Sequence, residues 1–265
     1  MSVTLILFII LFILMMIIGG GRGIKSFFTL FTNFFTLFFM LIIICNKVDP
    51  IKVTIVGAII ITYITLISAN GLNQKTIASL LSVTLVVIIT MILVYKMAYN
   101  AKIQGFGNEQ MESISTLSLY VQLNFAQISI CEILIGLLGA IIDVSISISS
   151  SMYEIYKSNV LKTKYELLKS GMNIGKDILG TMTNTLLFAY IGGFMTLIIY
   201  FKELHYSIGD ILNAKVFCSE VFQIFSGGIG IILIIPVTTV VTFMILYFEK
   251  RIHFKSTAVN NDISQ

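Results

Sequence analysis

Residues 133–153, ILIGLLGAIIDVSISISSSMY, form an apolar run that a single charged residue, Asp143, interrupts. A helix needs about 20 apolar residues to cross the hydrocarbon core of a bilayer, so this run is long enough to span a membrane. Uncharged runs of similar length cover 1–21, 26–46, 53–74, 76–95, 178–201 and 221–248. Closed barrels and helices alone satisfy every backbone polar group in lipid. The sequence predicts an all-α polytopic membrane protein with about seven transmembrane helices.

Composition leads to the same class, because 57% of the residues are hydrophobic, 11% are charged and the mean hydropathy is +0.98. Such values lie far from those of a soluble domain. We expect one integral membrane domain, residues 1–255, and a short polar cytoplasmic tail, residues 256–265. The first run lacks a basic start and a small-residue cleavage pattern, so it is interpreted as an uncleaved anchor.

A further uncharged run, residues 113–131, is rich in serine, asparagine and glutamine. Because so polar a stretch seldom faces lipid, we expect its first part to form an amphipathic helix at the membrane surface. An eighth span and a buried re-entrant segment remain the alternatives.

Lysine and arginine set the expected orientation. The connection 154–177 carries five lysines, and the C-terminal tail is also basic. Two spans separate these segments, so both are placed in the cytoplasm, and seven spans then put the amino terminus outside. Arg22 and Lys25 in the first loop agree with this orientation, whereas Lys96 and Lys102 argue against it. The overall charge of +4 is what such anchoring residues give.

Several kinds of chemistry lack support in the sequence. The three cysteines, Cys45, Cys131 and Cys218, have no paired spacing, and His205 and His253 stand alone. No glycine-rich loop is followed by the lysine that a nucleotide site needs. We therefore expect no metal, no cofactor, no nucleic-acid partner and no enzymatic activity.

A polar stripe follows one face of the segment around Asp143. Residues three or four positions apart share a face of a helix, and six residues recur at that spacing: Gly136, Gly139, Asp143, Ser147, Ser150 and Glu154. The glycines permit close approach of a neighbouring helix. The pattern predicts that Asp143 faces the interior of the bundle.

A carboxylate within the membrane costs about 2.5–3.5 kcal/mol on insertion scales and usually faces a cavity, a partner or a proton source. Because protonation turns an aspartate from an acceptor into a hydrogen-bond donor, Asp143 suits a proton relay. The alternative is a structural aspartate that bonds a neighbouring helix. Glu154, nearer the surface, fits a solvated position equally well.

A second polar stripe runs through residues 170–184, where Asn173, Asp177, Thr181 and Asn184 recur at helical spacing. Asp177 also fits the first turn of a helix, where an acid interacts with the helix dipole. Asn184 lies seven residues inside an uncharged run and needs a bonding partner. Since adjacent antiparallel spans tend to be neighbours, the first stripe is the expected partner.

The last span begins with a glycine cluster and contains a proline. Gly227 and Gly230 share a face with Thr238, and Pro236 removes a backbone donor from the interior of the helix. These residues predict either a hinge that lets the helix move or tight packing with a structural kink.

Three segments carry a family resemblance: GAIIDVSISISSSMYEI (139–155), SGMNIGKDILGTMTNTLLFAYIGG (170–193) and GGIGIILIIPVTT (227–239). In this order they resemble the signature segments of YibE/F-like membrane proteins, specifically over residues 136–240. The chain resembles the shorter, YibF-type members, although Ser145 stands where alanine is expected. The resemblance implies a multi-pass protein of the bacterial cytoplasmic membrane with a suspected role in transport and no established substrate.

A more distant likeness is to the second half of SecD/SecF-type proton-driven exporters, in which membrane acids drive the movement of large outer domains. This chain has no such domain after its first span. The likeness therefore implies a partner that supplies one, such as a YibE-type membrane protein, and a homo-oligomer is the alternative assembly.

Two hypotheses follow. In the first, the protein is a proton-coupled transporter or transporter subunit: Asp143 carries the proton, the other polar residues of the two stripes line the path, and the segment 227–236 moves. In the second, the protein is a membrane scaffold or an assembly or immunity partner, and the stripes only pack helices.

Overall fold

The computed structural model describes residues 3–101, 103, 124–158 and 163–262, and its side chains up to residue 247. Within these ranges every regular element is a helix, which confirms the all-α prediction. Six helices are long and apolar enough to span a membrane: α1 (Val3–Cys45), α2 (Pro50–Asn70), α3 (Gln74–Asn100), α5 (Phe125–Lys157), α6 (Lys164–Glu203) and α8 (Lys215–Asp262, of which Lys215–Tyr247 is the span). The short helix α7 (Ile208–Asn213) connects α6 to α8.

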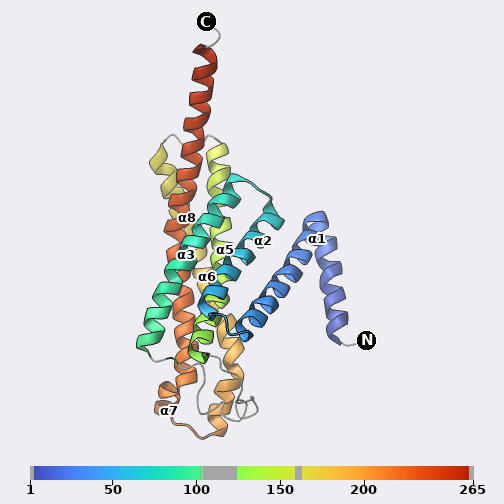
Figure 1. Cartoon of the computed structure of the whole chain (residues 1–265), viewed down its shortest axis with the longest axis vertical. Coiled ribbons are helices and arrows are strands. Elements are labelled where there is room, and N and C mark those ends of the chain that lie inside the picture. Colours follow the sequence, from blue (N-terminus) through green and yellow to red (C-terminus); the bar gives the residue numbers. More distant parts are fainter. Residues whose placement is uncertain (1–2, 102, 104–123, 159–162, 263–265) are drawn as a thin grey trace.

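The first two predicted spans are the two arms of α1. Gly20 has φ 53° and ψ −134°, a conformation that glycine adopts without a Cβ penalty, and the chain reverses there (Figure 1). A Cβ on Gly23 would lie 1.8 Å from the Met15 carbonyl oxygen, so the two arms touch near the turn. The ring of Phe27 lies 5.0 Å from that of Phe8 and 4.7 Å from that of Phe12. The seven apolar segments thus correspond to six helical elements, because α1 contains two of them, separated by the non-helical Gly20.

Polar bonds attach the second arm of α1 to α2. The Asn33 side-chain amide donates to the Thr65 hydroxyl at 2.8 Å, and Thr29 bonds to Ser68 one turn away. Further along, Gly57 lies against the side chain of Met40. The first arm of α1 lies outside the bundle, and its hydrophobic side chains are exposed, as lipid contact requires.

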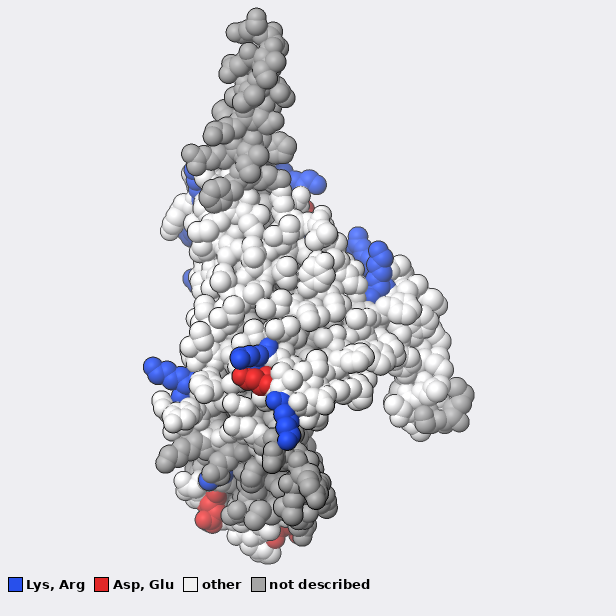
Figure 2. Space-filling model, viewed as in Figure 1, with Lys and Arg blue, Asp and Glu red and all other residues white. Residues whose placement is uncertain are grey.

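The centre of the bundle is α5, which packs most extensively against α8 and also against α3, α6 and α2. Its buried residues are mostly aliphatic, among them Leu134, Ile141 and Ile148. The helix begins after Asn124, whose side chain accepts a hydrogen bond from the Gln127 amide at 3.2 Å. Figure 2 shows a wide uncharged band between charged side chains that lie toward the two ends of the molecule.

The basic connection expected over residues 154–177 is largely helical. The helix α5 continues to Lys157, and α6 begins at Lys164 with a capping box formed by Thr163 and Glu166. At the other end of the chain α8 continues to Asp262, so residues 256–262 of the expected tail extend this helix beyond the bundle (Figure 1). The surface helix predicted within 113–131 falls mainly outside the described residues, and 125–131 are the first two turns of α5.

Candidate functional site

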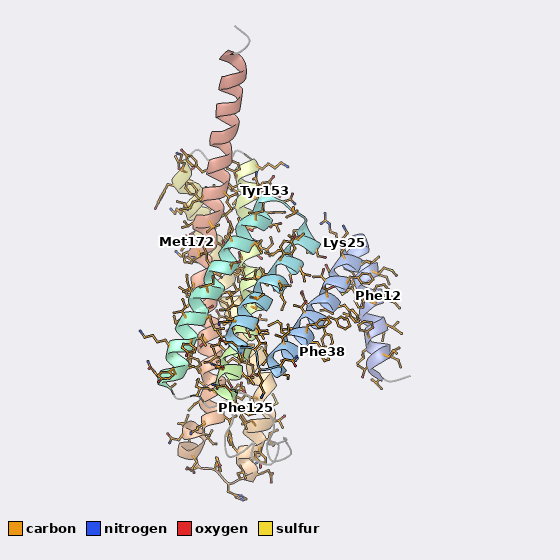
Figure 3. The ribbon with its side chains drawn as sticks, in the orientation of Figure 1. Phe12, Lys25, Phe38, Phe125, Tyr153 and Met172 are labelled. Carbon is orange, nitrogen blue, oxygen red and sulfur yellow. The ribbon has the colours of Figure 1, made fainter. Side chains whose placement is uncertain are left out.

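A pocket of about 640 Å³ lies between α1, α5, α6 and α8. It lies toward the end of the bundle that Phe38 and Phe125 mark in Figure 3, opposite Tyr153 and Met172. Apolar side chains from the end of α1 and the beginning of α5 form one wall. The described lining residues are Leu37, Met40, Leu41, Ile44, Ile128, Cys131, Glu132, Ile135, Gly136, Ala189, Tyr190, Gly193, Glu220 and Gln223.

Four polar side chains enter this pocket from three helices: Glu132 from α5, Tyr190 from α6, and Glu220 and Gln223 from α8. Gln223 is 8% exposed, and the Tyr190 hydroxyl is buried with no hydrogen-bond partner in bonding geometry. A buried hydroxyl without a partner costs free energy.

Gly136 allows the polar groups to reach α5. A Cβ at this position would lie 2.6 Å from the Tyr190 hydroxyl oxygen and 3.1 Å from the Gln223 amide nitrogen. Any larger residue therefore displaces these two side chains. This glycine was predicted as a helix-packing position, and the structure places it against polar side chains of α6 and α8.

The electrostatic environment of the pocket is negative. Two acidic side chains, Glu132 and Glu220, line it together with Tyr190. No lysine, arginine or histidine is among the described residues that line the pocket. The two carboxylates therefore have no cationic side chain beside them in the pocket to balance their charge.

The open face of α5, formed by Glu132, Gly139, Asp143 and Glu154, is exposed in the single chain. Asp143 thus lies on the surface of the chain, unlike the inward position expected from the sequence. The opposite face of α5 is occupied by Ile141 and its aliphatic neighbours, which gain more from burial. The two serines predicted on this face, Ser147 and Ser150, are both partly buried. The Ser147 hydroxyl donates a hydrogen bond to the Asp143 backbone carbonyl at 2.7 Å.

Three carboxylates follow this open face from end to end. Glu132, Asp143 and Glu154 recur every 11 residues, which is about three helical turns, so all three point the same way. The rise from the first to the last is about 33 Å, close to the thickness of a bilayer core of about 30 Å. Glu132 belongs to the pocket, Asp143 lies at mid-helix and Glu154 lies at the opposite end.

The second stripe is also exposed: Asn173, Asp177, Thr181 and Asn184 all lie on the surface of α6. The helix packs mainly against α5 and α8, as expected for adjacent antiparallel spans. Two contacts align α6 with α5: Gly171 lies against Met152, and Tyr190 lies against Gly136. At the position between these contacts, Asp143 lies at the same depth as about residue 182 of α6. The two stripes therefore have their central residues at the same depth.

The predicted glycines of α8 lie at helix contacts. Gly227 meets Leu186 of α6, and Gly230 meets Ile141 of α5, whereas Gly139 has no neighbour within 4 Å of an added Cβ. The helix α8 is continuous through Pro236, whose side chain is exposed. The hinge remains a prediction, and the two α8 glycines are positions of close packing in the structure.

A buried hydroxyl cluster joins α3, α5 and α8 in the core. Ser79 and Ser149 are hydrogen-bonded at 2.6 Å, and Ser145 bonds to Thr238 at 3.0 Å. Sequence reasoning missed this cluster, although it placed Thr238 on the glycine face and noted Ser145 as unusual. The spacing of four residues between Ser145 and Ser149, which puts both on one face of the helix, is the signal that could have shown it.

Metal chemistry has no support in the part of the chain that the structure describes. No three side chains among its His, Cys, Asp and Glu residues are grouped as metal ligands. The three cysteines are free, with Cys131 buried and the other two exposed.

The sequence analysis also missed the pocket carboxylates. Neither Glu132 nor Glu220 was identified from the sequence as a candidate site residue. Each lies one to two turns inside a membrane helix, and these matching depths are the signal that points to a shared site.

Comparison with known proteins identifies a family. The family model described as YibE/F-like protein matches residues 7–247, which include the pocket, both polar stripes and the buried hydroxyl cluster. Searches among curated proteins and among solved structures gave no match.

Proposed function

The chain belongs to the YibE/F-like family, and from this premise we propose that it is a membrane transporter, or a subunit of one, coupled to protons. Asp143 is the residue that takes up and releases the proton. The observation that carries the proposal is the open face of α5, where carboxylates at 132, 143 and 154 extend over about the thickness of a bilayer core.

Asp143 is a carboxylate at the middle of a membrane helix. A charged side chain at such a position raises the free energy of the protein in the hydrocarbon core, and such residues usually line pathways for protons or ions. Asp143 has no cationic partner on its own helix until Lys157, 14 residues further on. Uptake of a proton removes the charge, so an alternation between the two protonation states is the least costly use of this position.

The remaining polar residues extend this path. Ser147 and Ser150 lie between Asp143 and Glu154 on α5, and Thr181 and Asn184 lie at the level of Asp143 on α6. Asn173 and Asp177 continue the α6 stripe toward the basic end of the bundle. We place the protein in the bacterial cytoplasmic membrane with its C-terminus in the cytoplasm, which puts the pocket in the outer half of the bilayer.

The exposed face of α6 favours a second candidate, a scaffold or assembly partner. Asn184 lies within the uncharged run 178–201 and is exposed in the single chain. A polar side chain at this depth is best satisfied by another membrane helix. A YibE-type membrane protein or a second copy of the chain would supply it, and in a pure scaffold Asp143 would serve packing alone.

Proton flux separates the two candidates. We would reconstitute the wild type, Asp143→Asn and Asp210→Asn in liposomes with an internal pH-sensitive dye, impose a pH gradient, and screen inorganic ions and small metabolites. A proton-coupled carrier shows substrate-dependent flux that Asp143→Asn abolishes. Asp210 is exposed on α7, so Asp210→Asn serves as the matched control and retains the flux.

The variants also need a folding test, because Asn preserves the size of the side chain and its capacity for neutral hydrogen bonds. Size-exclusion elution and circular dichroism of Asp143→Asn should equal those of the wild type. Substrate-dependent flux that persists in a folded Asp143→Asn protein would remove Asp143 from the mechanism. No flux in any form would favour the scaffold.

A further inference from the structure

We propose that the pocket between α1, α5, α6 and α8 binds a protonated organic amine with an apolar body. The inference rests on the proposed transport function, for which it names the substrate class. It depends on three properties of the pocket: two carboxylates with no basic side chain in the described lining, its size with an apolar wall, and the buried Tyr190 hydroxyl, which has no partner in bonding geometry.

Charge is the first step. Glu132 and Glu220 both line the pocket, and its described lining contains no basic side chain. Two like charges in surroundings of low dielectric constant are costly, whereas a positive charge between them is attracted by both. The pocket therefore stabilises a ligand that carries a positive charge.

Size is the second step. A volume of about 640 Å³ is within the range of pockets for small organic molecules, roughly 300–1,000 Å³, and far above that of a bare ion. The described lining offers two carboxylates, and no group of three or more His, Cys, Asp or Glu side chains among the described residues could hold a metal ion. The wall formed by Leu37, Met40, Ile44 and Ile128 offers apolar contact, so the ligand carries hydrocarbon as well as charge.

Hydrogen bonding is the third step. The Tyr190 hydroxyl is buried without a partner in bonding geometry, and Gln223 beside it is 8% exposed. Oxygen atoms of a hydroxyl, an amide and two carboxylates accept hydrogen bonds from N–H groups. A primary ammonium has three such donors and a quaternary ammonium has none. The geometry of the polar groups thus favours a protonated amine.

The α5 geometry links this pocket to the proton path. Glu132 belongs to the pocket and also shares the open face of α5 with Asp143, about 16 Å along the helix axis. A cation in the pocket and a proton on Asp143 each add one positive charge to the same face of α5. Each of them therefore disfavours the other. The coupled process that fits this arrangement is exchange of a protonated amine for a proton.

Binding is tested apart from transport. The purified full chain in nanodiscs would be titrated by calorimetry with phenethylammonium, with 2-phenylethanol and with phenylacetate, three probes that share one apolar body. We expect measurable binding of the ammonium and at least tenfold weaker binding of the alcohol and of the anion. Equal affinity for the ammonium and the alcohol would overturn the proposal, because the carboxylates would then contribute nothing.

Variants assign the binding to the pocket. Glu132→Gln and Glu220→Gln should each weaken phenethylammonium binding at least tenfold, and Glu203→Gln, an exposed carboxylate at the end of α6, should leave it unchanged. If a glutamine variant fails to fold, as judged by size-exclusion elution, phenethyltrimethylammonium with the wild type replaces it. This quaternary probe has the same charge without N–H donors and should bind at least tenfold more weakly than phenethylammonium. Unchanged affinity in both glutamine variants, or equal affinity of the two cations, contradicts the proposal.

The two proposals fail separately. Ammonium binding without proton flux would remove the transport function and keep the site. Flux that depends on Asp143, together with undiminished ammonium binding in the glutamine variants, would remove the site and keep the transport function.

Discussion

At the scale of single residues, Gly136 is the position on which the pocket depends most directly. A Cβ there would lie 2.6 Å from the Tyr190 hydroxyl oxygen, a distance that real Cβ atoms do not show. We predict that Gly136→Ala lowers the free energy of unfolding by about 1–3 kcal/mol, the usual cost of overpacking. Thermal unfolding in detergent measures the effect.

Gly139→Ala is the matched control, because Gly139 is three residues further along the same helix and an added Cβ meets nothing within 4 Å. Its free energy of unfolding should stay equal to that of the wild type or rise, since alanine favours a helix by up to about 1 kcal/mol over glycine. Equal destabilisation by the two substitutions would show that Tyr190 moves away from α5 at little cost.

Helical spacing within one segment could predict part of the candidate site and no more. It identified the face that carries Gly136 and Asp143, because both residues lie on one helix. It could not assemble the pocket, since Glu132, Tyr190 and Glu220 come from three helices, and their proximity depends on how the helices pack. The orientation of the Asp143 face was predicted as inward, since the spacing of residues on a helix does not show which face the other helices cover.

At the scale of elements, the hydroxyl cluster should contribute a small amount to the association of α3 and α5. Ser79 and Ser149 are both buried and hydrogen-bonded at 2.6 Å. A double-mutant cycle with Ser79→Ala and Ser149→Ala should give a coupling free energy of about 0.6 kcal/mol and at most about 1.7 kcal/mol, the range found for hydrogen bonds between membrane helices. Unfolding in mixed micelles supplies the four free energies.

The cluster contains its own reference pair. Ser82 donates to the Ala78 carbonyl within α3, so Ser82→Ala combined with Ser149→Ala should show no coupling. A coupling free energy between Ser79 and Ser149 no larger than this value would show that their hydrogen bond contributes nothing to stability.

The short helix α7 gives a pH-dependent prediction outside the membrane spans. Hydrogen bonds from the Ser207 hydroxyl and from its backbone amide lower the pKa of Asp210 below its ordinary value of 3.8. A lowered pKa in the folded state stabilises the helix fully above pH 3.8, and this contribution is lost as the pH falls through the lower folded value. The capping box should therefore persist at neutral pH.

Ser207→Ala removes the hydroxyl bond and should raise the pKa of Asp210 toward 3.8, whereas Ser207→Thr keeps a hydroxyl and should leave the lowered pKa in place. A carboxyl-carbon NMR titration of Asp210 measures all three proteins. An identical titration of Ser207→Ala and the wild type would show that the hydroxyl does not interact with the carboxylate in solution.

Most helices could be predicted from hydropathy, because an apolar run long enough to span a bilayer has few other stable conformations. Their ends were less predictable. The first two runs are separate helical arms of α1 because the non-helical conformation of Gly20 reverses the chain between them, and α6 begins within the polar connection because Thr163 and Glu166 cap its first turn. Both outcomes depend on local backbone chemistry that hydropathy does not contain.

At the scale of the whole molecule, the outer face of α6 is incomplete in a single chain. Asp177, Gly180 and Asn184 follow one another at helical spacing and all are exposed, and an added Cβ on Gly180 has no neighbour within 4 Å. Small residues beside polar ones favour close contact between membrane helices. We therefore expect a further helix to cover this face in the bilayer.

A second copy of the chain fits this face, because a two-fold axis normal to the membrane and beside α6 brings the residues of this face near their own copies. The Asn184 amide is both donor and acceptor and so bonds to an identical amide. Lys176 and Asp177 are adjacent and exposed, and each offers the opposite charge to the other copy.

We predict that Gly180→Cys, in a background where Cys45, Cys131 and Cys218 are alanine, gives a disulfide-linked dimer in native membranes upon oxidation. Ile92→Cys on α3, at a position that is 65% exposed, should stay monomeric. A monomeric Gly180→Cys protein, or equal cross-linking at the two positions, would contradict pairing through α6, and the partner would then be a different membrane protein.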